Sequence, residues 1–86
     1  MSQSLNLVKN KLEELPNNIE AEQSVIGSIL LSNEIFDEIN ILISSKNFYD
    51  PMHQKIFEAI ENLIYKGMLA NPITLKNYFE NEKDEI

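Results

Sequence analysis

The single histidine of the chain, His53, is the residue type best suited to acid–base or nucleophilic chemistry. It follows Asp50 and Pro51 in the sequence, which leaves two interpretations open. In the first, His53 acts with Asp50 as a base or a ligand, because a nucleophile needs a base beside it. In the second, it is a partly buried imidazole bonded to a helix end or a backbone carbonyl. We favour the second, since no other residue completes a catalytic group.

Neighbouring carboxylates are the next candidates for chemistry. They occur at Glu13/Glu14, Glu20/Glu22, Asp37/Glu38 and Glu82/Asp84/Glu85. Two carboxylates perform acid–base catalysis only when unequal surroundings in a cleft separate their pKa values. These pairs fall on helix starts or outer faces, where interaction with the helix dipole and solubility explain them. We therefore expect Glu20 and Glu22 to serve helix initiation and not catalysis.

Metal and nucleotide sites are not indicated. The chain has no cysteine for a thiolate zinc site, and its acids lack the alternation with a turn glycine that a calcium loop requires. A phosphate-binding loop needs clustered glycines followed by lysine. The two glycines, Gly27 and Gly67, lie 40 positions apart, and Met68 follows the second. We expect no cofactor to bind this chain.

Composition restricts the class of protein further. The 86 residues carry seven lysines, no arginine and a net charge of −7, so a phosphate backbone is repelled and the seven aromatic rings lack a cationic groove. With 43% hydrophobic residues the chain is that of one small globular domain. No apolar run approaches the roughly 20 residues that span a bilayer, and the start lacks a signal-peptide core. These features predict a soluble, cytoplasmic, acidic interaction domain without membrane contact.

Helical spacing explains the apolar residues better than strand alternation does. Residues 1–15 form a polar arm, and its thin stripe of Leu5, Val8, Leu12 and Leu15 leaves open whether the arm frays or docks. After Pro16, Asn18 caps a helix over 19–31. Ser32 and Asn33 cap a second helix over 34–43, and 44–47 form a loop. The side chains expected to face the core from this second helix are Ile35, Phe36, Ile39, Leu42 and Ile43.

The strongest local pattern begins at Asp50 and Pro51, an N-cap followed by proline at the first helical position. This helix continues to Gly67, placed as a left-handed C-cap, with Ile56, Phe57, Ile60, Leu63 and Ile64 on one face. Asn71 and Pro72 repeat the cap-then-proline pattern and start a last helix through Leu75, Tyr78 and Phe79. The fold class is therefore all-α, a compact bundle of about four helices.

Three segments resemble the N-terminal domain of the DnaB-type replicative DNA helicases. They are Leu15-Pro16-Asn17-Asn18-Ile19-Glu20-Ala21-Glu22-Gln23-Ser24-Val25-Ile26-Gly27, Phe48-Tyr49-Asp50-Pro51-Met52-His53-Gln54-Lys55-Ile56-Phe57-Glu58-Ala59-Ile60, and Gly67 followed by Ile73-Thr74-Leu75. They match in order and spacing over about residues 15–80. Asn71 departs from the aspartate usual in the family, but either residue caps a helix.

The resemblance implies a division into a polar arm (1–15), the helical domain (16–80) and a polar end (81–86) of a truncated chain. The family's helical hairpin, linker and motor domain with Walker motifs would follow. The matched residues receive folding roles, and Gly27 is expected to allow close helix approach. The residues expected to have such structural roles are Asn18, Glu20, Gly27, Asp50, Pro51, His53, Ile56, Phe57, Ile60, Gly67, Asn71 and Pro72.

By the same resemblance, the chain is an assembly module without its own catalysis. Family members form the collar of a hexameric ring and bind primase, while ATP, Mg and single-stranded DNA belong to the motor domain of the full-length helicase. Alternatives are the helicase-binding domain of a primase-like protein and a small acidic regulator that uses His53 with Asp50. The chain alone is expected to be a monomer or weak dimer. Candidate contact residues, chosen from position, are Tyr65, Met68, Leu69, Tyr78 and Phe79.

Overall fold

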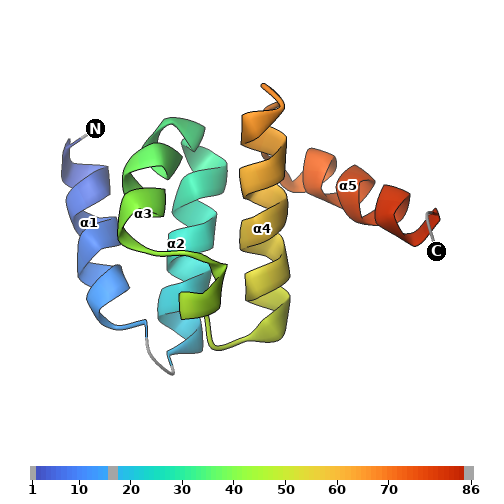
Figure 1. The fold of residues 1–86 in the computed structure, drawn as a ribbon. Helices are drawn as coiled ribbons and strands as arrows, with labels where there is room; N and C mark the ends of the chain where they lie inside the picture. Colours follow the sequence, from blue (N-terminus) through green and yellow to red (C-terminus); the bar gives the residue numbers. More distant parts are fainter. Residues whose placement is uncertain (1, 16–17, 85–86) are drawn as a thin grey trace.

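The computed structural model describes residues 2–15 and 18–84, and within these ranges every regular element is a helix. The elements are α1 (Ser2–Glu13), α2 (Ile19–Leu31), the short 3₁₀ helix η1 (Asn33–Ile35), α3 (Phe36–Leu42), the 3₁₀ turn η2 (Ser45–Asn47), α4 (Pro51–Tyr65) and α5 (Pro72–Asp84). Figure 1 shows α1, α3, α2 and α4 side by side, while α5 projects away from them beyond α4. The all-α prediction is confirmed.

Capping residues act where the sequence indicates. The Asn18 side chain accepts a hydrogen bond from the Ala21 amide at 3.0 Å and begins α2. Asp50 Oδ1 accepts from the Met52 amide at 2.8 Å and begins α4, with Pro51 at the first helical position. Asn71 Oδ1 accepts from the Thr74 amide at 2.9 Å, and the Thr74 hydroxyl accepts in return from the Asn71 amide. Each cap satisfies amides that an isolated helix end leaves without partners.

The N-terminal arm is a docked helix. Val8 of α1 and Leu15, two residues after the helix ends, are both 2% exposed, and Leu12 of α1 packs against the core at partial burial. α1 packs against α2. Of the two alternatives for the arm, the structure has a docked helix over Ser2–Glu13, because Val8 and Leu12 stand one turn apart and bury one face.

Three phenylalanines form the centre of the core. Phe57 of α4 lies between Phe36 of α3 and Phe48, at ring-centroid distances of 5.5 and 5.1 Å. Ile29 and Ile60 pack around them, each fully buried. Such tilted aromatic pairs contribute about 0.5–1.5 kcal/mol each beyond the burial of their area. The aromatic cluster therefore joins α3 to α4 and to the segment that connects them.

Three local expectations differ from the structure. The helix expected over 34–43 begins as η1 and continues as α3 only to Leu42, whose side chain is 54% exposed, so its assignment to the core is wrong. Because α3 spans only seven residues, its inner face is filled by Phe36 and Ile39 before Leu42 is reached. Ser32 makes no side-chain cap, since its hydroxyl donates to Glu34. α5 extends to Asp84, into the segment predicted as a polar end over 81–86, and residues 85–86 lie outside the described ranges.

The two glycines have different roles. Gly67 has φ +78° and ends the turn after α4, where the Met68 amide donates to the Leu63 carbonyl at 2.9 Å. Gly27 lies inside α2, and a Cβ built there would meet nothing within 4 Å, so the expected close helix approach at Gly27 is wrong. The conformational freedom of glycine is therefore needed at Gly67 alone.

Alanine substitutions should separate these roles. Gly27→Ala should raise the free energy of unfolding by up to about 1 kcal/mol, because alanine favours a helix and has room there. Gly67→Ala should lower it by about 1 kcal/mol, because a left-handed conformation strains a Cβ. Urea denaturation followed by circular dichroism measures both, and a destabilised Gly27→Ala chain would contradict this assignment.

Candidate protein-interaction surface

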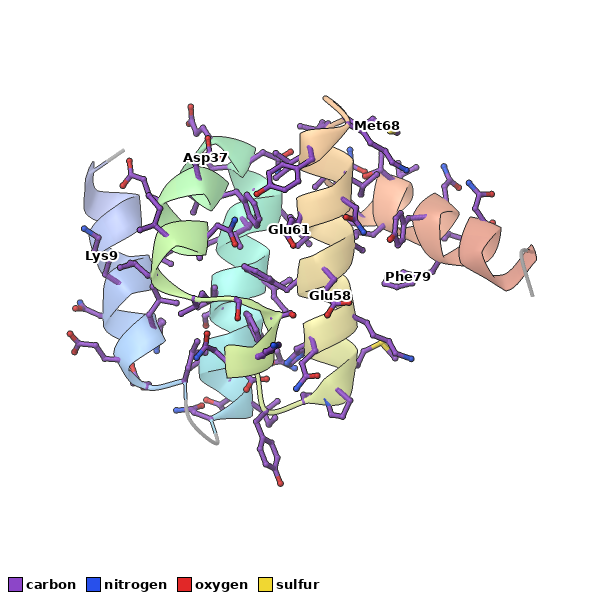
Figure 2. All side chains as sticks on the ribbon, in the orientation of Figure 1. Lys9, Asp37, Glu58, Glu61, Met68 and Phe79 are labelled. Carbon is purple, nitrogen blue, oxygen red and sulfur yellow. The ribbon has the colours of Figure 1, made fainter. Side chains whose placement is uncertain are left out.

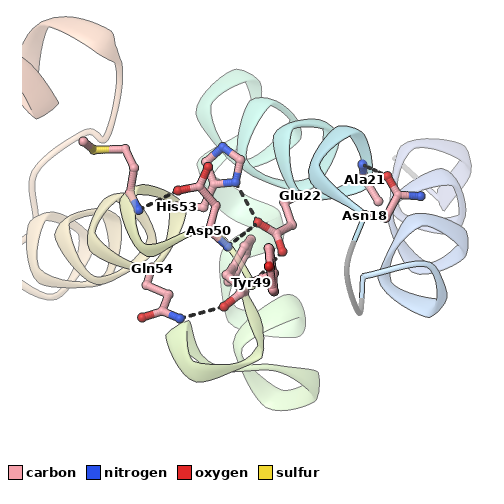
Figure 3. A network of polar contacts seen from close by, with 9 residues as sticks. Asn18, Ala21, Glu22, Tyr49, Asp50, His53 and Gln54 are labelled. Atoms are coloured by element: carbon pink, nitrogen blue, oxygen red, sulfur yellow. Dashed lines mark hydrogen bonds and ion pairs between the residues drawn. The ribbon is translucent and has the colours of Figure 1, made fainter.

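A carboxylate lies at the centre of the fold. Glu22 of α2 is completely buried, and its two oxygens accept hydrogen bonds from the backbone amides of Tyr49 and Asp50, the second at 3.2 Å. His53 Nδ1 lies 2.7 Å from Glu22 Oε1. Figure 3 shows these three donors converging on one side chain from the start of α4. Since a carboxylate only accepts, Nδ1 of His53 donates the proton in this contact.

The burial of Glu22 corrects the sequence-based expectation. Glu20 is exposed on the first turn of α2, as expected of a dipole-compensating acid, but Glu22 is not. Glu22 stands three, four and seven positions before Val25, Ile26 and Ile29, all buried, and so belongs to the same apolar face. That helical spacing was the signal in the sequence from which the burial of Glu22 could have been predicted. The hydrogen-bond donors to Glu22 are 27 to 31 residues away in the sequence, so local patterns do not reveal them. Two of the donors are backbone amides, which every residue except proline carries.

His53 is 8% exposed and is held by Glu22. The proposed pairing with Asp50 does not form, because the Asp50 carboxylate accepts from the Met52 amide as the α4 cap. The other interpretation also needs correction, since the partner of His53 is a buried carboxylate and not a helix end or a carbonyl. A completely buried acid satisfied by three donors holds α2 to the start of α4.

Within the described part of the chain, no group of three His, Asp or Glu side chains could hold a metal ion. The same residues contain no helix long and apolar enough to cross a membrane.

Several exposed apolar side chains lie where α4 ends and α5 begins. Tyr65, Met68 and Leu69 are 68%, 48% and 63% exposed, and Figure 2 shows Met68 at the C-terminal end of α4. Ile73, at the start of α5, is 72% exposed and was missed by the sequence analysis, because its position in the first turn gives no periodic signal. These four residues are called the α4–α5 surface below.

The other two candidate residues are placed differently. Tyr78 and Phe79 of α5 are half-buried and stack edge to face at 5.5 Å. The Tyr78 hydroxyl accepts from Asn62 of α4 at 2.8 Å, whereas the Tyr65 hydroxyl accepts from Asn40 of α3 at 3.3 Å. The two tyrosines therefore bond to different helices, Tyr78 to α4 and Tyr65 to α3. Tyr78 and Phe79 attach α5 to the bundle.

One asparagine orders the loop that carries this surface. Asn33 donates from Nδ2 to the carbonyls of Ile29 and Ala70 at 2.8 and 2.9 Å, and its Oδ1 accepts from the Ala70 amide at 2.7 Å. The loop after α4 is thus fixed to the turn after α2 by a two-way amide pair. Met68 and Leu69 are consequently presented by an ordered backbone, a role of Asn33 that the sequence analysis, which made it a cap, did not find.

Comparison with known proteins adds a family match. Residues 14–86 match the family model described as the DnaB-like helicase N terminal domain. No solved structure matches the chain significantly.

Curated relatives carry one name. The chain is 44% identical over 63 residues to the replicative DNA helicase DnaB of Rickettsia typhi and 43% identical over 72 residues to that of Buchnera aphidicola subsp. Baizongia pistaciae. These alignments cover 73% and 84% of this chain but 13% and 16% of the relatives. The chain thus spans about a seventh of the length of the proteins it resembles.

Replacing Glu22 tests the buried network. Glu22→Gln should lower the free energy of unfolding by about 2–3 kcal/mol, because an amide offers one acceptor oxygen to three donors and turns an NH₂ toward one of them. Glu20→Gln, two positions away and exposed, is the matched control and should change stability by less than about 0.5 kcal/mol. Thermal and urea melts provide the measurement, and equal effects of the two variants would refute the proposed network.

Proposed function

The chain belongs to the family of DnaB-like helicase N-terminal domains, and from that premise we propose that it is an assembly and protein-interaction module of a replicative DNA helicase. The family match over residues 14–86 carries the proposal, since it takes in α2 to α5 and the whole Glu22 network. Relatives that are named replicative DNA helicases support it. This chain matches only a small part of a whole helicase, so the helicase activity of the full-length protein is a proposal as well.

The proposed division of labour assigns ATP-driven unwinding of duplex DNA, in the cytoplasm, to a separate motor domain. ATP and Mg would bind there, because the described residues of this chain do not fit a nucleotide. Gly27 lies inside α2 and Gly67 ends the α4 turn, so neither approaches a phosphate through a loop. His53 is engaged by Glu22. The net charge of −7 also disfavours DNA contact by this part, so single-stranded DNA would be held by the motor domain.

The proposed partners are primase and other copies of the helicase within a hexameric collar. The α4–α5 surface supports this role, because exposed large apolar side chains close together in the chain, two of them on one ordered loop, are typical of protein interfaces. Asn33 holds that loop through Ala70 before any partner arrives. A preorganised loop loses less conformational entropy on binding, which leaves more of the interaction energy for affinity.

Two serine substitutions should test the surface. Met68→Ser with Leu69→Ser should weaken primase binding about tenfold or more, because two exposed side chains lose apolar area that the complex would bury. Met52→Ser, 58% exposed at the opposite end of α4, is the matched control and should bind normally. Isothermal titration against purified primase from the same organism measures the effect. Unchanged affinity of the double variant, with its circular dichroism intact, would exclude this surface.

The oligomeric state of the chain alone gives a second test. We expect a monomer or weak dimer at micromolar concentration, because copies with a net charge of −7 repel one another and the α4–α5 surface is small. Light scattering on a sizing column measures the mass directly. A stable hexamer under these conditions would show that the chain assembles the ring without further segments.

A further inference from the structure

The last helix and the turn before it are bonded mainly to each other. The Thr74 hydroxyl donates to the Leu69 carbonyl at 2.8 Å, which ties the turn to the start of α5. Thr74 also exchanges two hydrogen bonds of 2.9 Å with the residue that caps the helix. One residue before this turn the bonding changes, because the Met68 amide donates back to the Leu63 carbonyl of α4. We call residues 69–81 the α5 unit.

Few polar contacts join the α5 unit to the other helices. Among the described residues, three hydrogen bonds cross between them. Two of these pair the Asn33 side chain with the backbone of Ala70, at 2.9 and 2.7 Å. The third runs from Asn62 of α4 to the Tyr78 hydroxyl. Figure 1 shows α5 leaving the bundle beyond α4.

The apolar contact of the α5 unit with the bundle is also small. The unit places two buried side chains in the core, Ala70 and Leu75, whereas α2 and α4 each bury five residues. Tyr78 and Phe79 pack against the core at partial burial, and Figure 2 shows Phe79 in the angle between α4 and α5. A segment with few buried contacts opens at a lower free energy than the whole molecule unfolds.

We propose that the α5 unit opens cooperatively from the folded bundle, and that Asn33 holds it closed. The hinge is the junction of Met68, whose amide stays bonded to α4, with Leu69; both side chains are exposed. Opening breaks the two bonds between Asn33 and Ala70 and leaves the Glu22 network of the core intact. A detached helix of 13 residues is marginal in water, so α5 loses its helical hydrogen bonds when it opens.

The opening controls the α4–α5 surface. Met68 stays with α4 when the α5 unit opens, whereas Ile73 moves with α5. The surface is therefore complete only in the closed state, and a partner that contacts both residues shifts the equilibrium toward closure. This consequence rests on the proposed function, whereas the opening itself does not.

Native-state hydrogen exchange of the ¹⁵N-labelled chain, followed by NMR, tests the opening without any partner. We expect the amides of 75–79 and the Ala70 amide to share one opening constant, because all of them are released together. That constant should exceed the one for core amides such as those of Ile29 and Phe57 about tenfold or more. Equal constants would overturn the proposal, as would protection that fades gradually along 75–79 while Ala70 stays protected, which indicates fraying.

Variants test the residues that hold the unit closed. Asn33→Ala loses both bonds to Ala70 and should raise the opening constant of the α5 unit about tenfold or more. Tyr78→Phe loses the bond from Asn62 and should raise it about threefold. Tyr65→Phe is the matched control, because its hydroxyl bonds to α3 and that contact persists in the open state. An effect of Tyr65→Phe on α5 exchange equal to that of Tyr78→Phe would contradict the assignment.

A core variant distinguishes opening of the α5 unit from global unfolding. Ile39→Val in α3 removes one buried methylene that stays packed when the unit opens. It should raise the opening constants of core amides in α2 and α4 about fivefold and leave that of the α5 unit unchanged. The same increase in all three helices would show that α5 opens only with the whole molecule, and the proposal would be wrong.

Discussion

The buried carboxylate of Glu22 is the interaction on which the arrangement of the central helices depends. It connects α2 to the start of α4 by accepting from two consecutive backbone amides and from His53. Taking a charged group out of water is costly, and only a full set of donors offsets that cost. The network therefore tolerates one register of α2 against α4, which in turn sets where Phe57 meets Phe36 and Phe48. Apolar packing alone is less selective between neighbouring registers.

The small size of the core also determines how many apolar side chains stay exposed to solvent. Because 86 residues bury a limited share of their surface, several large apolar side chains stay exposed. Four of them form the α4–α5 surface. Two of these four, Met68 and Leu69, lie on a loop that Asn33 binds through the backbone of Ala70. A module of this kind provides binding surfaces on a rigid frame, which agrees with the proposed role in helicase assembly.

Much of the fold could be predicted from the order of residues. The cap and proline pairs placed α4 and α5 to within the first residue, and the family resemblance is confirmed by the match over residues 14–86. The candidate interaction surface was harder to predict from the sequence. Tyr65, Met68 and Leu69 are exposed as their selection requires, but Tyr78 and Phe79 pack against the bundle. Periodicity shows which residues share a helix face; it does not show which face a neighbouring helix covers.

The sequence by itself determined where α2, α4 and α5 begin, because their caps Asn18, Asp50 and Asn71 each bond to an amide within three residues. Only the tertiary structure decided that Glu22 is buried and that Asn33 binds a loop 37 residues away. The physical reason is that those partners are mostly backbone groups, which every residue carries. Their identity appears only when packing brings two distant segments together.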